Sequence, residues 1–341
     1  MEMTGEGFSQ KNTDPIFRRY SRYLKEKYGE RVYRISVDAG FTCPNRLSDG
    51  SGGCTFCDER GSRAVYQEEA FEGKKIRIKR GGGAVSERLE LIRLQIERGR
   101  AFLSKRYGTD KFILYFQAFT NTFGPPEVLD KIYRYALSLE SFRELIVSTR
   151  PDCVGPAHAD LLASYKSENF DVWVELGLQS YHDATLERVN RGHLSSVFTR
   201  AYNLLKERGI KITVHLIFGL PGEGRREIMQ TVDKVALLRP DGIKIHNLDI
   251  VRGTELEAEY MRGELNVPSD KRHLEYVMEA LERLPEETVV QRVTCDTRKD
   301  TLAAPLRFMD KNRFYSSLDK EMRRRGKRQG RLFQKEKGLR G

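Results

Sequence analysis

Short apolar runs rich in β-branched residues alternate along most of the chain with segments whose apolar residues repeat at helical spacing. The strand-like runs cover residues 31–38, 111–118, 143–149, 170–178, 211–218 and 243–250. The helix-like segments between them cover residues 86–107, 126–139, 157–166, 196–208 and 223–238. Strands separated by helices predict parallel βαβ units, and near-continuous apolar runs predict strands that are covered on both faces. We therefore expect an α/β fold, a partial (β/α)6 barrel of parallel strands whose chemistry lies at the strands' carboxyl ends.

The regular alternation of strand-like and helix-like segments does not continue beyond residue 263. A helix over 270–284, capped by Asp270, and a strand over 288–293 are expected there, followed by a polar and then basic segment. We expect a helical lead-in over 1–30, a barrel core over 31–263 and a small α+β accessory region over 264–341.

The net charge of +11 is concentrated at one end of the chain. Residues 320–341 contain ten Lys and Arg against two Glu, which leaves the rest of the chain with only +3. A basic tail suits an acidic partner such as nucleic acid, and a solvated terminus is the alternative. The first residues form no signal-peptide segment, and no apolar run reaches bilayer length, so we expect a cytoplasmic protein without a membrane partner.

Three of the five cysteines, Cys43, Cys54 and Cys57, fall in one glycine-rich loop directly after the first predicted strand. Their C-x10-C-x2-C spacing supplies soft thiolate ligands that suit iron–sulfur clusters and zinc. Structural zinc usually takes four ligands from two short pairs, so here it would need a fourth ligand, which Cys153 could supply. An electron-transfer protein also expects four cysteine ligands. A cluster held by three cysteines leaves one iron open, as catalytic metal sites do.

The segment from Phe41 to Ser62 resembles the cluster loop of radical S-adenosylmethionine (SAM) enzymes in a variant with a widened first spacing. Phe56 stands at that family's aromatic position before the last cysteine. The order of motifs resembles the elongator- and coproporphyrinogen-oxidase-like branch, and within it the YhcC-type bacterial family. The motifs are RISVDAGFTCPNR, YFQAFTNTF, STRPDC, ELGLQS, RGH and HLIFGLPGEG.

This resemblance implies a 4Fe–4S cluster on the three cysteines, with SAM bound to the open iron. One electron from a reductant such as flavodoxin or ferredoxin would cleave SAM, and the resulting 5′-deoxyadenosyl radical would take a hydrogen atom from a substrate. Elongator-type enzymes modify transfer RNA, so RNA is a candidate for the unidentified substrate. A zinc- or cluster-binding RNA module without radical chemistry is the alternative.

The resemblance also implies which residues contact SAM. They are Phe56, the backbone of Phe119, Thr120 and Asn121, the side chains of Gln179, Arg191 and His215, and Leu248 in the sixth-strand motif. Other interpretations of these residues stay open. Gln179 and Asp183 could cap the following helix. His215 and His246 could be hydrogen-bonded core residues.

Asp38, Arg150 and Cys153 follow predicted strand ends and are candidate catalytic residues on the substrate side. Asp38 and Arg150 could instead form ion pairs in the barrel mouth. Cys153 could instead be a small buried apolar residue, as free cysteines often are. Cys295 is expected to be structural.

Overall fold

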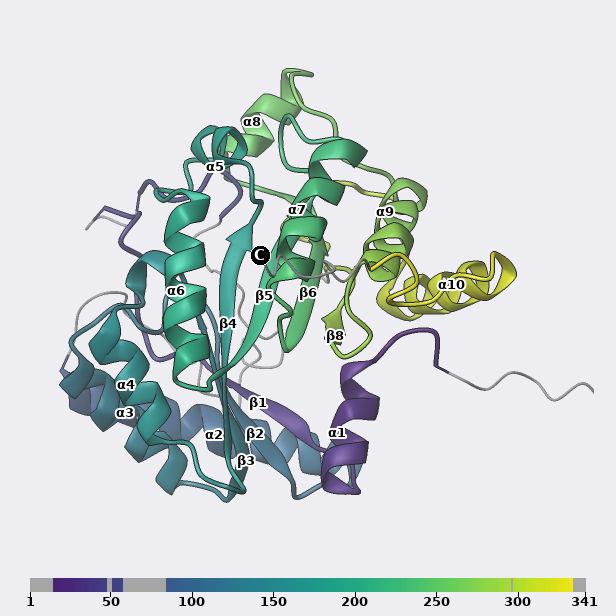
Figure 1. The fold of residues 1–341 in the computed structure, drawn as a ribbon. Coiled ribbons are helices and arrows are strands. Elements are labelled where there is room, and N and C mark those ends of the chain that lie inside the picture. Colours follow the sequence, from purple (N-terminus) through teal and green to yellow (C-terminus); the bar gives the residue numbers. More distant parts are fainter. Residues whose placement is uncertain (1–14, 48–50, 58–83, 296, 334–341) are drawn as a thin grey trace, which may run out of the picture.

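The computed structural model describes residues 15–47, 51–57, 84–295 and 297–333. Residues 1–14 of the expected lead-in, the spacer glycine Gly50 and residues 334–341 of the basic tail lie outside these ranges. In the described part, seven strands form one parallel sheet that curls into a half-barrel (Figure 1). In sheet order the strands are β1 (Tyr33–Val37), β2 (Phe112–Phe116), β3 (Phe142–Thr149), β4 (Asp171–Gln179), β5 (Lys211–Phe218), β6 (Gly242–Asn247) and β8 (Val289–Arg292). The predicted partial barrel is confirmed.

Helices cover the outer side of this sheet, as right-handed crossovers between parallel strands require (Figure 1). They are α2 (Val85–Tyr107), α3 (Pro126–Ser138), α4 (Pro156–Ser164), α6 (Ser195–Glu207), α7 (Arg225–Leu237) and α9 (Asp270–Arg283). The short helices η2 (Pro151–Cys153), α5 (Asp183–Arg188) and α8 (Glu255–Met261) lie after strand ends. Within the described ranges, no helix is both long and apolar enough to cross a membrane.

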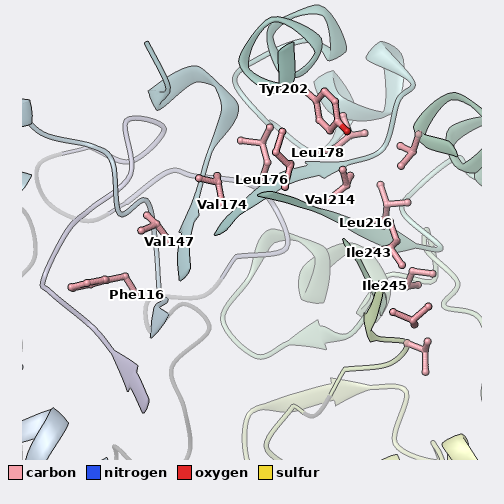
Figure 2. Close-up of a cluster of buried hydrophobic side chains, with 14 of the residues drawn as sticks. Phe116, Val147, Val174, Leu176, Leu178, Tyr202, Val214, Leu216, Ile243 and Ile245 are labelled. Carbon is pink, nitrogen blue, oxygen red and sulfur yellow. The ribbon is translucent and has the colours of Figure 1, made fainter. Parts of the chain in front are cut away.

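The two faces of the sheet differ in polarity. Side chains on the outer face, such as Val174, Leu176, Val214 and Ile243, are fully buried against the helices (Figure 2). The alternate residues of β4, β5 and β6 face the barrel lumen and include several charged and histidine side chains. The prediction of apolar strands therefore holds for the outer face. The side chains on the lumen side are polar where they line the cavity.

Helix α1 (Tyr20–Tyr28) closes the end of the barrel opposite the strands' carboxyl ends. Its Leu24 packs with Ile113, Ile146 and Trp173, which face the lumen near the start of the sheet. Tyr23 meets the Trp173 ring edge to face, with ring centroids 5.9 Å apart. The interior of the barrel is therefore apolar at its base and polar above.

The C-terminal region adds a strand to the core sheet. Strand β8 pairs in parallel with β6, and Val290 N donates a hydrogen bond to Arg18 O of the N-terminal segment at 2.8 Å. Helix α9 is capped by Ser269, whose hydroxyl accepts from Arg272 N, so the expected Asp270 cap is wrong by one residue. Asp270 instead lies in the first turn, where a negative charge is also favourable. The domain boundary at residue 263 remains a prediction.

The described part of the basic tail packs against the body. It begins in the last turns of α10 (Lys311–Arg324) and runs on to residue 333. The buried Gln329 donates from Nε2 to Pro285 O at 2.6 Å and to Thr288 O at 2.8 Å. Glu282, which is 1% exposed, pairs with both Lys327 and Arg331. Two cations of the described tail, Lys327 and Arg331, are thus paired with one buried carboxylate of the body.

A two-stranded ribbon lies beside the end of β6. It is formed by β7 (Ile250–Val251) and β9 (Leu302–Ala304), which pair antiparallel. The apolar residues Ile250 and Ala304 of the ribbon pack in one small cluster with Leu248 and Phe56. The ribbon therefore helps to fix the segment after β6 and the end of the cysteine loop.

Candidate active site

The loop that carries the three clustered cysteines follows β1 and is tied to the segment after β4. Thr55 N donates a hydrogen bond to Val189 O at 3.1 Å, and Asn190 Nδ2 donates to Gly53 O at 2.7 Å. Gly53 has φ +101°, a conformation that favours glycine. The loop is therefore held at the mouth of the barrel, as expected from its position after the first strand.

The Cys54 thiol lies among cationic and amide donors. Arg191 Nη1, Arg150 Nη1 and Asn45 Nδ2 lie 3.6, 3.8 and 3.9 Å from Cys54 Sγ. Positive charge and hydrogen bonds around a ligand sulfur tune the metal bound to it. Arg150 also pairs with Asp152 at 2.8 Å, so its guanidinium is held in place. This donor set fits a thiolate that binds an iron–sulfur cluster.

A cavity of about 570 Å³ opens between the loop and the barrel lumen, a size typical of ligand sites. The predicted site residues that line it are Cys43, Cys54, Phe56, Cys57, Phe119, Thr120, Arg150, Gln179, Arg191, His215 and Leu248. Asp38, Asn121 and Cys153 are not among its lining residues, whereas Cys295 is. Among the described side chains, no group of three or more His, Cys, Asp or Glu is arranged to hold a metal ion.

Gln179 and Arg191 meet where β4 ends. The pairing of β4 with β5 shifts register between Gly177 and Gln179, and Gln179 has φ +73°. Arg191 Nη2 donates to Gly177 O at 2.7 Å, while Gln179 Oε1 is buried with no partner in the described part of the chain. Asp183 accepts from Ser195 N at 2.7 Å. Ser195 is the first residue of α6, so Asp183 satisfies an N-terminal N–H of the helix predicted over 196–208, as the helix-cap interpretation expects. In the described part of the chain Gln179 makes no such bond, and α5 has no side-chain cap.

The turn after β2 is shaped by left-handed residues and by Asn121. Ala118 and Phe119 have φ of 73° and 56°, which is uncommon outside glycine. Asn121 Nδ2 donates to Ser148 O at 2.9 Å and to Ala118 O at 3.2 Å, which joins the turn to the end of β3. The turn thus presents Phe119 and Thr120 to the cavity, while the Asn121 side chain bonds to the backbone.

The remaining substrate-side candidates lie behind the cavity wall. The Asp38 carboxylate accepts a hydrogen bond from Gly40 N at 3.0 Å, and Asp38 N donates to Gln95 Oε1 at 2.9 Å. Cys153 is 9% exposed, and its burial raises the pKa of the thiol to about 12. A thiol with this pKa is not ionised near neutral pH, so it is a poor nucleophile.

A buried charge network, which the sequence analysis did not identify, crosses the lumen below the mouth. Glu175 accepts from Tyr115 Oη at 2.6 Å, from Lys244 Nζ at 2.9 Å and from Arg34 Nη1 at 3.1 Å. Burial alone would raise the pKa of Glu175, but Lys244 and Arg34 hold it at about 2. The signal for this network was a polar residue between apolar neighbours in β1, β5 and β6, as at Arg34, His215 and Lys244.

The fold and this arrangement define a class of protein. A curled parallel half-barrel with a three-cysteine loop over its strands' carboxyl ends is the architecture of a radical SAM enzyme. Residues 42–235 match the model of the radical SAM superfamily, and residues 240–324 match that of the Radical_SAM C-terminal domain. The chain is therefore a radical SAM enzyme.

Comparison with individual proteins narrows the family. Protein YhcC of Escherichia coli (strain K12) is 38% identical over 284 residues, which span 83% of this chain and 84% of that protein. The uncharacterized protein YtqA of Bacillus subtilis (strain 168) is 33% identical over 98% of both chains. The chain belongs to this YhcC/YtqA family, within the elongator-like branch of the radical SAM superfamily.

A solved structure supports the same fold. The archaeal Methanocaldococcus infernus Elp3 with an N-terminal deletion superposes with a TM-score of 0.63 at 20% sequence identity. The match covers 87% of this chain but 64% of that one, so this chain spans less than two thirds of that structure's length. At this level of identity the likeness shows the fold alone.

Proposed function

We propose that Cys43, Cys54 and Cys57 hold a 4Fe–4S cluster and that SAM binds in the adjoining cavity. One observation carries this proposal: the three cysteines line the same cavity as Gln179 and Arg191. Proteins of this superfamily generally bind such a cluster and SAM. When bound, the cluster supplies the electron that cleaves SAM to methionine and a 5′-deoxyadenosyl radical, which takes a hydrogen atom from the substrate.

The residues of this chain have separate roles in that proposal. Arg150 and Arg191 direct positive charge at Cys54 Sγ and so stabilise the added negative charge when the cluster is reduced. Gln179, with its unpartnered buried oxygen, is available to bind a polar group of SAM. Phe56 and Leu248 pack in one apolar cluster beside the cavity and suit the flat adenine ring.

The partners of the reaction are proposed more generally. A one-electron donor of the flavodoxin or ferredoxin type would reduce the cluster. RNA remains a candidate substrate because of the elongator-like branch. The described tail gives this little support, because Arg325 pairs with Glu275, and both Lys327 and Arg331 pair with Glu282.

Cleavage of SAM tests the proposed function directly. The full chain is reconstituted with iron and sulfide without air, reduced with dithionite and incubated with SAM. We expect 5′-deoxyadenosine and methionine in equal amounts, detected by liquid chromatography and mass spectrometry. An iron-loaded, reduced chain that leaves SAM intact would contradict the proposal.

The close approach at Gly177 gives a prediction for SAM binding. A Cβ added there would lie 2.9 Å from Arg191 Nη2 and 3.0 Å from Gln179 Nε2, so Gly177→Ala must displace both side chains. We expect SAM to bind about tenfold more weakly, the cost of one hydrogen bond to a charged group. Equilibrium dialysis measures the binding. Gly155→Ala is the control, because its Cβ would meet only His158 Nδ1 at 3.7 Å.

The contact between Arg191 and Cys54 gives a prediction for the cluster potential. Arg191→Met removes a positive charge whose Nη1 lies 3.6 Å from Cys54 Sγ. Hydrogen bonds to cluster sulfurs raise reduction potentials, so we expect the midpoint to fall by about 60 mV, one tenfold step for one electron. A redox titration followed by electron paramagnetic resonance measures it. Arg188→Gln is the control, because Arg188 pairs with Glu259 at the surface.

A further inference from the structure

A layer of three cations lies in the barrel lumen below the proposed SAM site. Arg34, Lys244 and Arg292 come from β1, β6 and β8, and all three line the cavity that also contains the cysteines. We name them the lumen cations. Lys244 precedes Leu248 by four residues, so it lies about 13 Å deeper along the strand direction. The layer is therefore reached from the SAM site but distinct from it.

The three lumen cations outnumber the one carboxylate that pairs with them. Glu175 pairs with both Lys244 and Arg34, and its carboxylate thus serves two cations. In the described part of the chain, the guanidinium of Arg292 has no ion pair or hydrogen bond to another side chain or to the backbone. Unpaired charges are costly in a cavity lined by protein, so such a group points to a bound counter-charge.

Two histidines add further unpartnered groups to the same layer, and His215, which pairs in register with Lys244, is thereby assigned to this layer and not to SAM. The rings of His215 and His246 lie edge to face with centroids 4.2 Å apart, and both residues line the cavity. The Nε2 atom of each is buried and without a partner among the described residues. Burial and the neighbouring Lys244 lower the pKa of His215, so its ring is neutral near pH 7 and still carries one N–H donor.

We propose that Arg292, Lys244 and the two histidines bind an oxyanion of the substrate, a phosphate or a carboxylate group. The Lys244 ammonium has three protons, and its bonds to Glu175 and to Tyr115 Oη at 3.1 Å use two. The ligand then accepts hydrogen bonds from one Lys244 proton, from the Arg292 guanidinium and from the imidazole N–H groups. The planar guanidinium of arginine can donate two parallel hydrogen bonds to either anion.

This inference rests on the proposed function, because it identifies a substrate class for that site. An anion held by this layer would fix one end of a small molecule deep in the lumen. The rest of the molecule would extend toward the SAM site at the barrel mouth. Substrates that carry a phosphate or a carboxylate would therefore be selected, and cationic ones would be repelled by the lumen cations.

Anion-dependent stability tests this inference without knowledge of the substrate. The melting temperature of the iron-loaded full chain is measured against sodium phosphate and sodium acetate, with sodium chloride at equal ionic strength as the reference. Phosphate stabilises proteins generally, but that effect does not saturate. We expect a saturable rise in the wild type and about tenfold weaker apparent affinity in Arg292→Gln, the loss of one charge-assisted pair.

Matched variants separate the anion site from general effects. Arg292→Lys should keep part of the response, and Arg226→Gln, which changes a side chain that is 81% exposed, should keep all of it. A response to phosphate alone would identify a phosphate-bearing substrate, and a response to acetate alone a carboxylate. No saturable response, or an equal response in Arg292→Gln, would overturn the inference.

The iron content of the same samples separates failure of this inference from failure of the proposed function. A chain that takes up no iron but shows an Arg292-dependent response would contradict the proposed function and support the anion site. An iron-loaded chain without that response would overturn the anion site alone.

Discussion

Alanine at Cys43, Cys54 or Cys57 is expected to abolish the bound cluster. A reconstituted wild-type chain should contain about four iron atoms, and each variant close to none, because a cluster with only two thiolate ligands is poorly held. SAM cleavage should fall by more than about 100-fold, since losing an outer partner of a metal ligand already costs 10–100-fold. Iron and sulfide analysis, visible absorption and the yield of 5′-deoxyadenosine measure these effects.

The other two cysteines supply the controls for this experiment. Cys153 is buried outside the cavity lining, and Cys295 lines the cavity but lies outside the cysteine loop. Cys153→Ala and Cys295→Ala should keep the full iron content. If all five variants lost iron equally, or if the loop variants kept it, the assignment of the three ligands would be wrong.

Replacing Glu175 by glutamine is expected to destabilise the fold strongly. The carboxylate is 2% exposed and is the ion-pair partner of both Lys244 and Arg34, so the variant leaves one buried and one half-buried cation without a counter-charge. Removing one member of a buried ion pair costs about 3–5 kcal/mol of unfolding free energy. Urea denaturation followed by circular dichroism measures this change.

An exposed ion pair gives the matched control for Glu175. Glu264 pairs with Arg262 at the surface, where both side chains are more than half exposed, so Glu264→Gln should cost less than about 1 kcal/mol. A loss of less than about 1 kcal/mol in Glu175→Gln would show that the lumen network is not a buried ion-pair network.

The same carboxylate predicts a direction for the pH dependence of stability. The folded pKa of Glu175 is about 2, below the usual value of about 4.3 for an unfolded glutamate. Its contribution is therefore complete above the unfolded pKa and is lost as the pH falls toward the folded pKa. Between pH 5 and pH 2, wild type should lose more stability than Glu175→Gln.

The architecture was largely predictable because its signals are local. Apolar runs and helical periodicity are read over windows of ten to twenty residues, and the six core strands were found from them. The joining of β8 to β6 was missed as part of the same sheet, because strand pairing depends on contacts between distant residues such as Gly242 and Val289. Helix α10 was missed in a segment that reads as polar.

The site was predictable in part for a similar reason. Three cysteines at short spacing on one loop have a local chemical signature, and the family motifs fix where they lie relative to the strand ends. The lumen network has no such signature, because Arg34, Tyr115, Glu175 and Lys244 come from four strands and meet only when the sheet curls. Asn121 is the reverse case. A family motif marked it as a site residue, but its side-chain amide bonds to the backbone beside the cavity.

Electron paramagnetic resonance of the reduced, reconstituted chain tests the central claim most directly. If Cys43, Cys54 and Cys57 hold a cluster with one open iron, the protein is brown and shows the signal of a reduced 4Fe–4S cluster. The signal should then change shape when SAM is added, because SAM binds at that iron. A colourless, zinc-containing protein, or a cluster signal that SAM leaves unchanged, would contradict the account.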